Sequence, residues 1–390
     1  MTILRGIGSI NGLAGALLVA LAVGARAAPV TAQACDWPDW NIFKSTAMSA
    51  DGRVTDASEN GITTSEGQSY GLFFALVAND RASFDKLLAW TENKLAGGDL
   101  AARLPAWLWG RRSAGQPADW DVLDTNSASD ADLWIAYTLL EAGRLWHERR
   151  YRALGSIMAR AIVRQETAQL PGLGRTLLPG ADGFHPAPDL WRLNPSYVPL
   201  QLMRGLASAL PHQAEWKALV DTSAHLVNDT APRGFSPDWV LYRSGHGFEP
   251  DVQTRAESAY NAVRVYLWAG MLAPDEPLRA ATLRTFAPLA DYVSANGFPP
   301  ERIDTRTGES GPNAGNAGFS AAVAPYLAAL GRDDLARAQQ ERARAAAANA
   351  PLGYYSSVLT LFGIGYLEGR YRFDAGGRLV PAWTATCPGR

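Results

Sequence analysis

The sequence predicts an all-α fold, an (α/α)6 barrel of six helical hairpins with long aromatic-rich loops forming a substrate cleft. Apolar residues recur at spacings of three and four through nearly the whole chain, which is the period of amphipathic helices. These apolar stripes, about twelve in number, follow one another in pairs across turns that contain Gly or Pro. Six antiparallel helix pairs can close into a ring. An open helical solenoid would need a repeating sequence period, and the chain has none.

The predicted helices can be followed in order along the chain. Turns such as Leu210-Pro211-His212 and Ala273-Pro274-Asp275 separate neighbouring stripes. The last stripe is apolar on much of its circumference, as a helix of the inner ring should be. In chain order the predicted helices are Trp40–Met48, Tyr70–Val77, Phe84–Leu95, Leu133–Leu145, Tyr151–Val163, Val198–Leu210, Trp216–Val227, Ala259–Leu272, Leu278–Val293, Phe319–Leu330, Leu335–Ala348 and Leu359–Tyr371.

Three long stretches interrupt the helical period, at residues 97–126, 170–194 and 231–251. They are rich in Trp, Pro and Gly, and loops of this length are usually functional or disordered. Their tryptophans argue against disorder, and flat rings stack on the apolar faces of sugars. We therefore expect these stretches to form the walls of a cleft, with aromatic residues Trp107, Trp109, Trp120, Trp191 and Trp239.

Composition and charge limit the class of partner. The formal net charge of the 390 residues is −2, which argues against nucleic acid or an anionic membrane as the main partner. A neutral substrate fits better. The 13 Trp and 13 Tyr are many for this length, and those not needed in the core can line a groove.

The first residues are typical of an export signal. One basic residue, Arg5, precedes a short apolar run, Leu13–Val23, and small-residue cleavage sites follow. We expect residues 1–34 to be a signal peptide, with cleavage after Ala27 as the alternative. Residues 35–390 then form a single barrel domain, periplasmic or secreted. A retained N-terminal anchor is the competing interpretation, although the run is short for a membrane span.

The two cysteines, Cys35 and Cys387, stand at opposite ends of the predicted mature chain. In an oxidising compartment they can close nearly the whole chain, a link worth roughly 5 kcal/mol in the loop-entropy description. Two unpaired thiols are the alternative, because sequence does not show proximity. Two Cys and five His without ligand spacing do not make a zinc site, so we expect no metal and no cofactor.

Three segments carry acids at predicted helix starts. Glu66 follows the candidate cap Thr64-Ser65, so it lies in a first helical turn, where an acid can also serve only the helix dipole. Asp130 and Asp132 precede the helix at Leu133, and capping is again the simple interpretation. In the third segment, Glu257, Asn261 and Arg264 are spaced to share one helix face, which a solvated surface would also explain.

Several of these motifs together resemble glycoside hydrolase family 8. The matching segments are Ser65-Glu66-Gly67-Gln68-Ser69-Tyr70-Gly71, Ala128–Trp146, Asn194-Pro195-Ser196-Tyr197 and Tyr260-Asn261-Ala262-Val263-Arg264. Within the family, the periplasmic endoglucanases encoded with bacterial cellulose synthases are most similar, and Cys35-Asp36-Trp37-Pro38-Asp39-Trp40 resembles the mature start of that group. The resemblance covers essentially all of the chain after the signal.

The resemblance implies an inverting, metal-free β-1,4-glucan hydrolase on an (α/α)6 barrel. Glu66 matches the family's proton donor, and Asp130 matches the acid at the cleaved sugar, a possible nucleophile or base. Residues expected to bind substrate are Tyr70, Trp109, Tyr197, Tyr260 and Arg264. As donor, Glu66 must hold its proton near neutral pH, so aromatic walls or the charge of Asp130 must outweigh the helix N-terminus.

The chain departs from the family pattern at the general base. Many members have Asp where this chain has Asn261, and an amide does not accept a proton usefully at neutral pH. The base can be relocated to Glu257, Asp251 or Asp130, or it can lie elsewhere in this branch of the family. Alternatively, catalysis has been lost and the groove only binds glucan.

The leading functional hypothesis is an endo-β-1,4-glucanase linked to bacterial cellulose synthesis or secretion. Its partners would be a β-1,4-glucan and, functionally, the cellulose synthase machinery, and we expect a monomer. The alternatives are a non-catalytic glucan-binding protein on the same fold, which Asn261 favours, or a related xylanase or chitosanase. Chitosan is cationic and should require several cleft acids beyond those named, which disfavours it.

Overall fold

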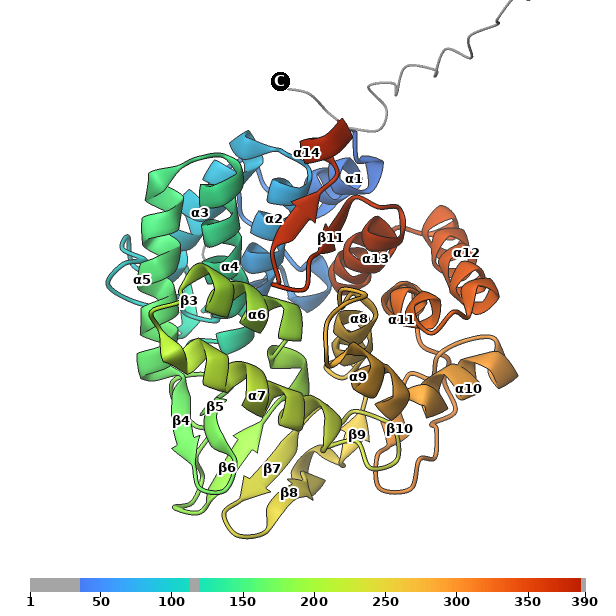
Figure 1. Cartoon of the computed structure of the whole chain (residues 1–390). Helices are drawn as coiled ribbons and strands as arrows, with labels where there is room; N and C mark the ends of the chain where they lie inside the picture. Colours follow the sequence, from blue (N-terminus) through green and yellow to red (C-terminus); the bar gives the residue numbers. More distant parts are fainter. Residues whose placement is uncertain (1–35, 113–118, 387–390) are drawn as a thin grey trace, which may run out of the picture.

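Two concentric rings of helices make up the computed structural model, which describes residues 36–112 and 119–386 (Figure 1). The inner helices are buried around most of their circumference, whereas the outer helices bury one face. The inner ring consists of α2 (Ser65–Val77), α4 (Ser129–Leu145), α6 (Leu200–Ala209), α8 (Val263–Gly270), α11 (Ala317–Ala329) and α13 (Tyr354–Leu367). The outer ring consists of α1 (Pro38–Ala47), α3 (Arg81–Leu95), α5 (Arg149–Gln165), α7 (Ala214–Asn228), α9 (Arg279–Thr285), α10 (Ala287–Asn296) and α12 (Asp333–Asn349).

The two ends of the described chain close the ring. Helix α1 packs outside α13, so the sixth helix pair is assembled from the first and last long helices. Trp37, just before α1, lies so close to Gly365 of α13 that a Cβ at Gly365 would meet the indole at 2.6 Å. Trp37 also contacts Phe74 of α2, edge to face, at 5.9 Å. The predicted (α/α)6 barrel is therefore confirmed.

Aromatic side chains from opposite inner helices fill the barrel axis. Phe362 of α13 lies 4.6 Å from Phe74 of α2, 5.2 Å from Trp134 of α4 and 5.1 Å from Trp268 of α8, measured between ring centroids. All four rings are buried. The axis is thus a packed core, and any site must lie at an end of the barrel.

Short strands occupy the loops that the sequence predicted as aperiodic. Residues 97–126 contain two strands that join β1 in one sheet, and residues 231–251 contain two that join β6 in another. The all-α prediction missed these pairings because the strands are only two to five residues long. The strands are β1 (Thr63–Thr64), β2 (Leu108–Arg111), β3 (Trp120–Asp124), β4 (Thr167–Leu170), β5 (Gly174–Leu177), β6 (Leu190–Leu193), β7 (Val240–Arg243), β8 (Gly247–Pro250), β9 (Glu257–Ser258), β10 (Ile303–Asp304), β11 (Tyr371–Phe373) and β12 (Leu379–Pro381).

Three helix predictions need correction. The stripe predicted over 278–293 is two helices, α9 and α10, because Pro288 lacks the N–H that a continuous helix would use. The last predicted helix ends at Leu367, and Tyr371 lies in β11. The eighth begins at Val263, not at Ala259. A short α14 (Trp383–Thr386) and the 3-10 turns η2 (Ala57–Glu59), η3 (Pro195–Tyr197) and η4 (Val252–Thr254) were not predicted.

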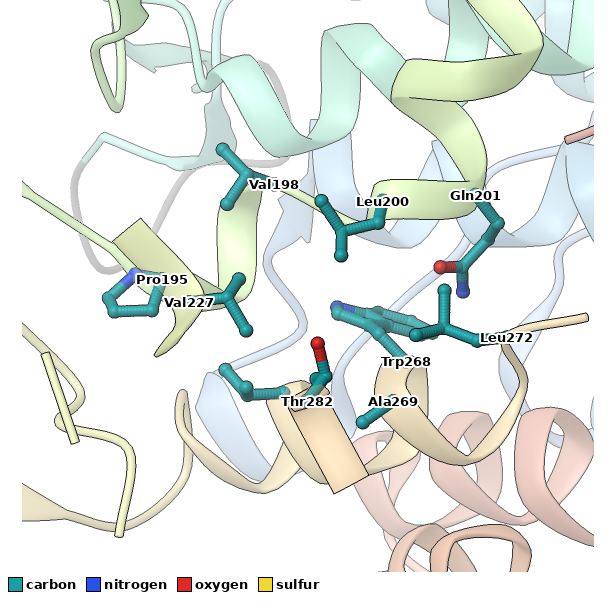
Figure 2. A pocket seen from close by; sticks show the side chains of 10 residues that line it. Pro195, Val198, Leu200, Gln201, Val227, Trp268, Ala269, Leu272 and Thr282 are labelled. Atoms are coloured by element: carbon teal, nitrogen blue, oxygen red, sulfur yellow. The ribbon is translucent and has the colours of Figure 1, made fainter. Parts of the chain in front are cut away.

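A small cavity of about 10 Å³ lies between α6, α7, α8 and α9 (Figure 2). Most of its lining is apolar, including Trp268 and Val227. Both polar atoms of the Gln201 amide and the hydroxyl of Thr282 lack a hydrogen-bond partner within the described part of the chain. The volume is near the minimum that holds one water molecule.

The predicted signal peptide and both cysteines, Cys35 and Cys387, lie outside the described residues. Among the residues described, no helix combines the length and apolarity needed to cross a membrane.

Candidate active site

Glu66 lies in the first turn of the inner helix α2. The Thr64 side chain caps this helix by accepting a hydrogen bond from the backbone N–H of Gly67 at 3.1 Å. Gly67 is needed here because a Cβ would meet the hydroxyl of Tyr354, on α13, at 2.9 Å. The Glu66 side chain is 23% exposed, so it is the member of the site that reaches toward solvent.

Asp130 lies in the first turn of α4 and is 2% exposed. One carboxylate oxygen accepts a hydrogen bond from the N–H of Ala131 at 2.8 Å. The other oxygen accepts from Nη1 of Arg264 at 3.1 Å. Two helix N-termini, those of α2 and α4, thus present an acid to the same point at one end of the barrel.

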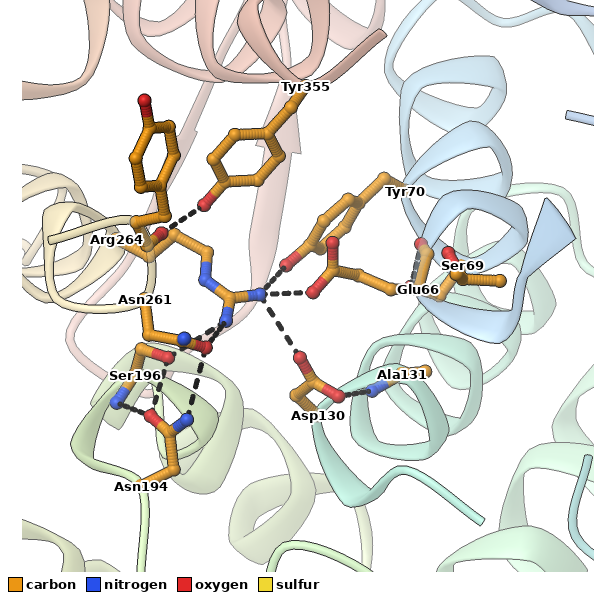
Figure 3. A network of polar contacts seen from close by, with 12 residues as sticks. Glu66, Ser69, Tyr70, Asp130, Ala131, Asn194, Ser196, Asn261, Arg264 and Tyr355 are labelled. Atoms are coloured by element: carbon orange, nitrogen blue, oxygen red, sulfur yellow. Dashed lines mark hydrogen bonds and ion pairs between the residues drawn. The ribbon is translucent and has the colours of Figure 1, made fainter. Parts of the chain in front are cut away.

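Arg264, in the first turn of α8, joins the two acids (Figure 3). Its Nη1 donates to the carboxylates of Glu66 and Asp130 and to the hydroxyl of Tyr70. The guanidinium is 3% exposed and contacts two carboxylates, so it is the cation that offsets the charge of the buried Asp130 and the partly exposed Glu66. Its Nη2 donates to Ser196 Oγ at 3.0 Å and Asn261 Oδ1 at 2.8 Å.

The protonation of Asp130 depends on its burial and on its two charged neighbours. Burial and the charge of Glu66 raise the pKa of Asp130 to about 8, although Arg264 pulls it down. The pKa of Arg264 is raised well above its usual value by the surrounding carboxylates, despite burial, so the guanidinium stays charged. Asp130 therefore holds a proton over much of the neutral range, beside a guanidinium that stays charged.

Asn261 lies beside Arg264 with its amide oxygen already used. Asn261 Oδ1 accepts from Arg264 Nη2 and, at 3.1 Å, from Nδ2 of Asn194. The Asn194 oxygen in turn accepts from the N–H and the hydroxyl of Ser196. Only the Asn261 amide nitrogen remains available, and it is a hydrogen-bond donor, so Asn261 cannot take a proton from water.

Glu257 does not share a helix face with Asn261 and Arg264, as its spacing had predicted. Residues 257–258 form strand β9, and α8 begins only at Val263. The Asp238 carboxylate holds the intervening turn by accepting from the N–H groups of Ala259 and Ala262, both at 2.8 Å. A helical spacing rule therefore does not apply before residue 263.

The other two candidate bases are held in ion pairs outside the Arg264 network. Glu257 accepts from Arg302 at 2.7 Å and from Arg255 at 3.1 Å. Asp251 is 1% exposed and pairs with Arg192 at 2.8 Å. Of the three candidate bases, the structure brings only Asp130 next to Glu66.

The predicted aromatic residues occupy different depths around the site. Tyr70 is 1% exposed, and its hydroxyl accepts a hydrogen bond from Arg264 Nη1 at 3.0 Å. Tyr197 lies near the guanidinium, with 5.6 Å between ring centroid and Cζ. Tyr260 is 36% exposed, and its hydroxyl donates to Glu301 at 2.6 Å. Trp109 stacks on Trp120 at 5.1 Å, away from the Arg264 network.

Sequence reasoning missed three members of the network. Tyr355, at the start of α13, donates to the backbone oxygen of Tyr260 at 2.6 Å. Asn194 and Ser196 fix Asn261 and Arg264 from the η3 turn. The segment Asn194-Pro195-Ser196-Tyr197 had been matched as a motif, but only its tyrosine had been given a role. No group of His, Cys, Asp and Glu within the described ranges is arranged to hold a metal ion.

Comparisons with known proteins agree with this geometry. The family profile described as Glycosyl hydrolases family 8 matches residues 16–369. The chain is 49% identical over 373 residues to an endoglucanase of Xanthomonas axonopodis pv. citri, covering 95% of each protein. It is 47% identical over 357 residues to an endoglucanase of Escherichia coli K12, covering 91% of this chain and 93% of the relative.

A solved structure extends the similarity to the fold. The crystal structure of an endo-1,4-D-glucanase from Vibrio fischeri superposes with a TM-score of 0.84 at 45% identity, over 90% of this chain and all of the other.

Proposed function

The chain belongs to glycosyl hydrolases family 8, and we propose that it cleaves internal β-1,4 bonds of glucan at the site around Arg264. It is a glycoside hydrolase of the endo-β-1,4-glucanase type, as the names of its relatives indicate. The observation that carries the mechanism is that one buried guanidinium holds Glu66 and Asp130 together. Glycosidic cleavage needs two carboxyl groups of different protonation at one point.

In this proposal Glu66 donates the proton to the leaving glycosidic oxygen. The Glu66 side chain is partly exposed, whereas that of Asp130 is buried. The burial that raises the pKa of Asp130 keeps a proton on Asp130 at neutral pH. A proton held there can pass to Glu66 when a sugar covers the site and displaces water.

Asp130 is our proposed acceptor of the proton from the attacking water. The proton balance closes within the pair: Glu66 gives one proton to the glycosidic oxygen, Asp130 takes one from water, and transfer between them restores the start. Asn261 cannot perform this step, because its free amide group is a donor. Its role in this account is to hold Arg264 and to donate a hydrogen bond into the site.

The spacing of the two acids sets a condition on substrate binding. Two oxygens that both contact one guanidinium nitrogen are at most about 6 Å apart. Inverting glycosidases place their carboxyls roughly 6.5–9.5 Å apart to admit water. A bound sugar must therefore displace Glu66 from Arg264, and we propose that this displacement opens the site for inversion.

The setting of the enzyme extends the proposal. The export signal that the sequence predicts at residues 1–34 supports a periplasmic or secreted location. Similarity to endoglucanases encoded with cellulose synthases supports a functional link to cellulose synthesis or secretion. We also propose that the chain acts as a monomer, since one chain supplies the whole Arg264 network.

Reducing-end release from a soluble cellulose derivative tests the assignment of Glu66. The mature chain should release reducing ends, and Glu66→Gln should lose at least about 100-fold in kcat, because general acids contribute 10²–10⁴. Glu59→Gln, an amide substitution at an exposed glutamate seven residues earlier, is the control and should retain full activity. Equal activity of wild type and Glu66→Gln would overturn the assignment.

A further inference from the structure

Two further acids are buried near Asp130. Asp132, in the first turn of α4, and Glu166, which follows the last turn of α5, are both 0% exposed. Both Asp132 oxygens and one Glu166 oxygen lack a conventional donor within the described part of the chain. Buried charges normally have a cation or several donors, so this arrangement needs an explanation.

A shared proton supplies the explanation. The Asp132 and Glu166 side chains lie within hydrogen-bonding range of each other. Two carboxylates cannot form such a bond, because neither has a proton to donate, but a carboxylic acid can donate to a carboxylate. With one proton on Asp132, its carboxylic acid can donate a hydrogen bond to a Glu166 oxygen, so oxygens that otherwise lack a partner bond to each other. The Glu166 carboxylate then accepts from Asp132 and from the hydroxyl of Ser127 at 2.6 Å.

The charges around the pair favour keeping this proton. Asp130 is the other ionisable group whose charge bears on Asp132, and for Glu166 the interacting side chains are Ser127 and Asp132. Among the described residues, no Lys, Arg or His forms an ion pair with either acid. Burial raises the pKa of Asp132 well above its usual value and that of Glu166 to about 7.

The pair also holds the start of α4, which carries Asp130. Ala128, the N-cap residue, provides no side-chain hydrogen bond to this helix. Instead, Ser127 Oγ bridges Glu166 and the N–H of Ala181, at 3.2 Å. Asp130 and Asp132 are two residues apart in the same turn. The turn is thus fixed through Asp130 to Arg264 on one side and through Asp132 to Glu166 on the other.

We propose that Asp132 and Glu166 are positioning residues that share one proton, and that this proton locks the first turn of α4 so that Asp130 meets Arg264 and Glu66. Loss of the proton leaves two carboxylates facing each other in the core. Their repulsion displaces the turn and with it Asp130. The pair therefore adds a second protonation step to the alkaline limit of the hydrolase. This effect on activity rests on the proposed function, whereas the sharing of the proton does not.

Asp132→Asn tests the sharing of the proton through unfolding. Its amide donates to Glu166 without a titratable proton, so the variant should fold. A group with a raised folded-state pKa loses stability as pH rises toward that pKa. Between the unfolded-state pKa of an aspartate, about 4, and the higher folded-state pKa of Asp132, the unfolding equilibrium constant of wild type should rise relative to that of Asp132→Asn, by up to tenfold per pH unit. Asp334→Asn, at an exposed acid in the first turn of α12, should follow wild type.

The pH profile of kcat/KM tests the positioning. On the alkaline side, kcat/KM of wild type should fall with the loss of two protons, and kcat/KM of Asp132→Asn with the loss of one. Near neutral pH the two proteins should have similar activity. Glu166→Gln, whose amide can donate to Asp132, should behave like Asp132→Asn. Parallel unfolding curves of wild type and Asp132→Asn, or failure of both variants to fold, overturn the shared proton. Identical limbs overturn the positioning role. Absence of activity in wild type refutes the proposed function and leaves the unfolding test standing.

Discussion

Replacing Arg264 by methionine removes the one cation that both catalytic acids contact. The side chain is 3% exposed, and its loss also strips donors from Tyr70, Ser196 and Asn261. Removing one partner of a buried ion pair costs about 3–5 kcal/mol, because the other charge stays buried without compensation. We expect a loss of this size at pH 9, above the pKa of about 8 of Asp130, where the Asp130 carboxylate of wild type is mostly charged.

The loss should shrink in acid. Arg264 lowers the pKa of Asp130, so Arg264→Met raises it beyond its present value of about 8. A folded-state pKa that rises further removes stability as pH increases, by about 1.4 kcal/mol per unit over the added range. At pH 5 Asp130 is protonated in both folded proteins, whereas at pH 9 it is ionised mainly in wild type, so the loss should be smaller at pH 5 by up to about 1.4 kcal/mol.

Equilibrium urea unfolding at pH 5 and pH 9, with kcat at both, measures this. Arg204→Met is the matched control. Arg204 forms an ion pair with the buried Glu276, with 2.9 Å between the nitrogen and the oxygen, and this pair is not part of the Arg264 network. That variant should lose stability and keep kcat, whereas Arg264→Met should lose both. Equal destabilisation of Arg264→Met at the two pH values, or a loss below 1 kcal/mol, would refute the view that Arg264 balances the acid pair.

Three further predictions follow from other parts of the structure. Asn261→Asp keeps the two contacts of the amide oxygen and replaces the free amide donor with a basic oxygen. Its kcat should therefore rise about tenfold or more. An unchanged or lower kcat would show that a base at position 261 does not help the reaction. Gln201→Met removes two unpaired polar atoms beside the cavity of Figure 2 and should leave the free energy of unfolding equal or higher by about 1 kcal/mol; destabilisation by more than that means the amide is satisfied by buried water. The anomeric form of the first product, followed by NMR on a cello-oligosaccharide, should be α; a β product would indicate retention and overturn the opening of the acid pair by substrate.

The helical architecture was predictable because its cause is local. A buried helix such as α13 is apolar on most of its surface, and that pattern is present in the sequence itself. The break between α9 and α10 was also readable in principle, because Pro288 stands in the stripe. The pairing of β1 with β2 was not, since the two strands are more than forty residues apart in the chain.

The site was predictable in its residue types and not in its arrangement. Glu66 and Asp130 were found through their motifs and helix starts. Their convergence depends on Arg264, which is 198 residues from Glu66 in the chain, so no spacing rule reveals it. The helix face predicted for Glu257 failed because Asp238 holds residues 259–262 as a turn. Asp132 was given no role of its own, since nothing in the sequence places Glu166 beside it.

The assignment of Asp130 as the proton acceptor is tested most directly by comparing three amide variants on one cello-oligosaccharide. Asp130→Asn should lose at least about 100-fold in kcat while still binding the oligosaccharide. Glu257→Gln and Asp251→Asn should keep kcat within a few-fold of wild type, because their carboxylates are held by Arg302 and Arg192 outside the network. A fully active Asp130→Asn beside an inactive Glu257→Gln or Asp251→Asn would contradict the account and place the base on the other carboxylate.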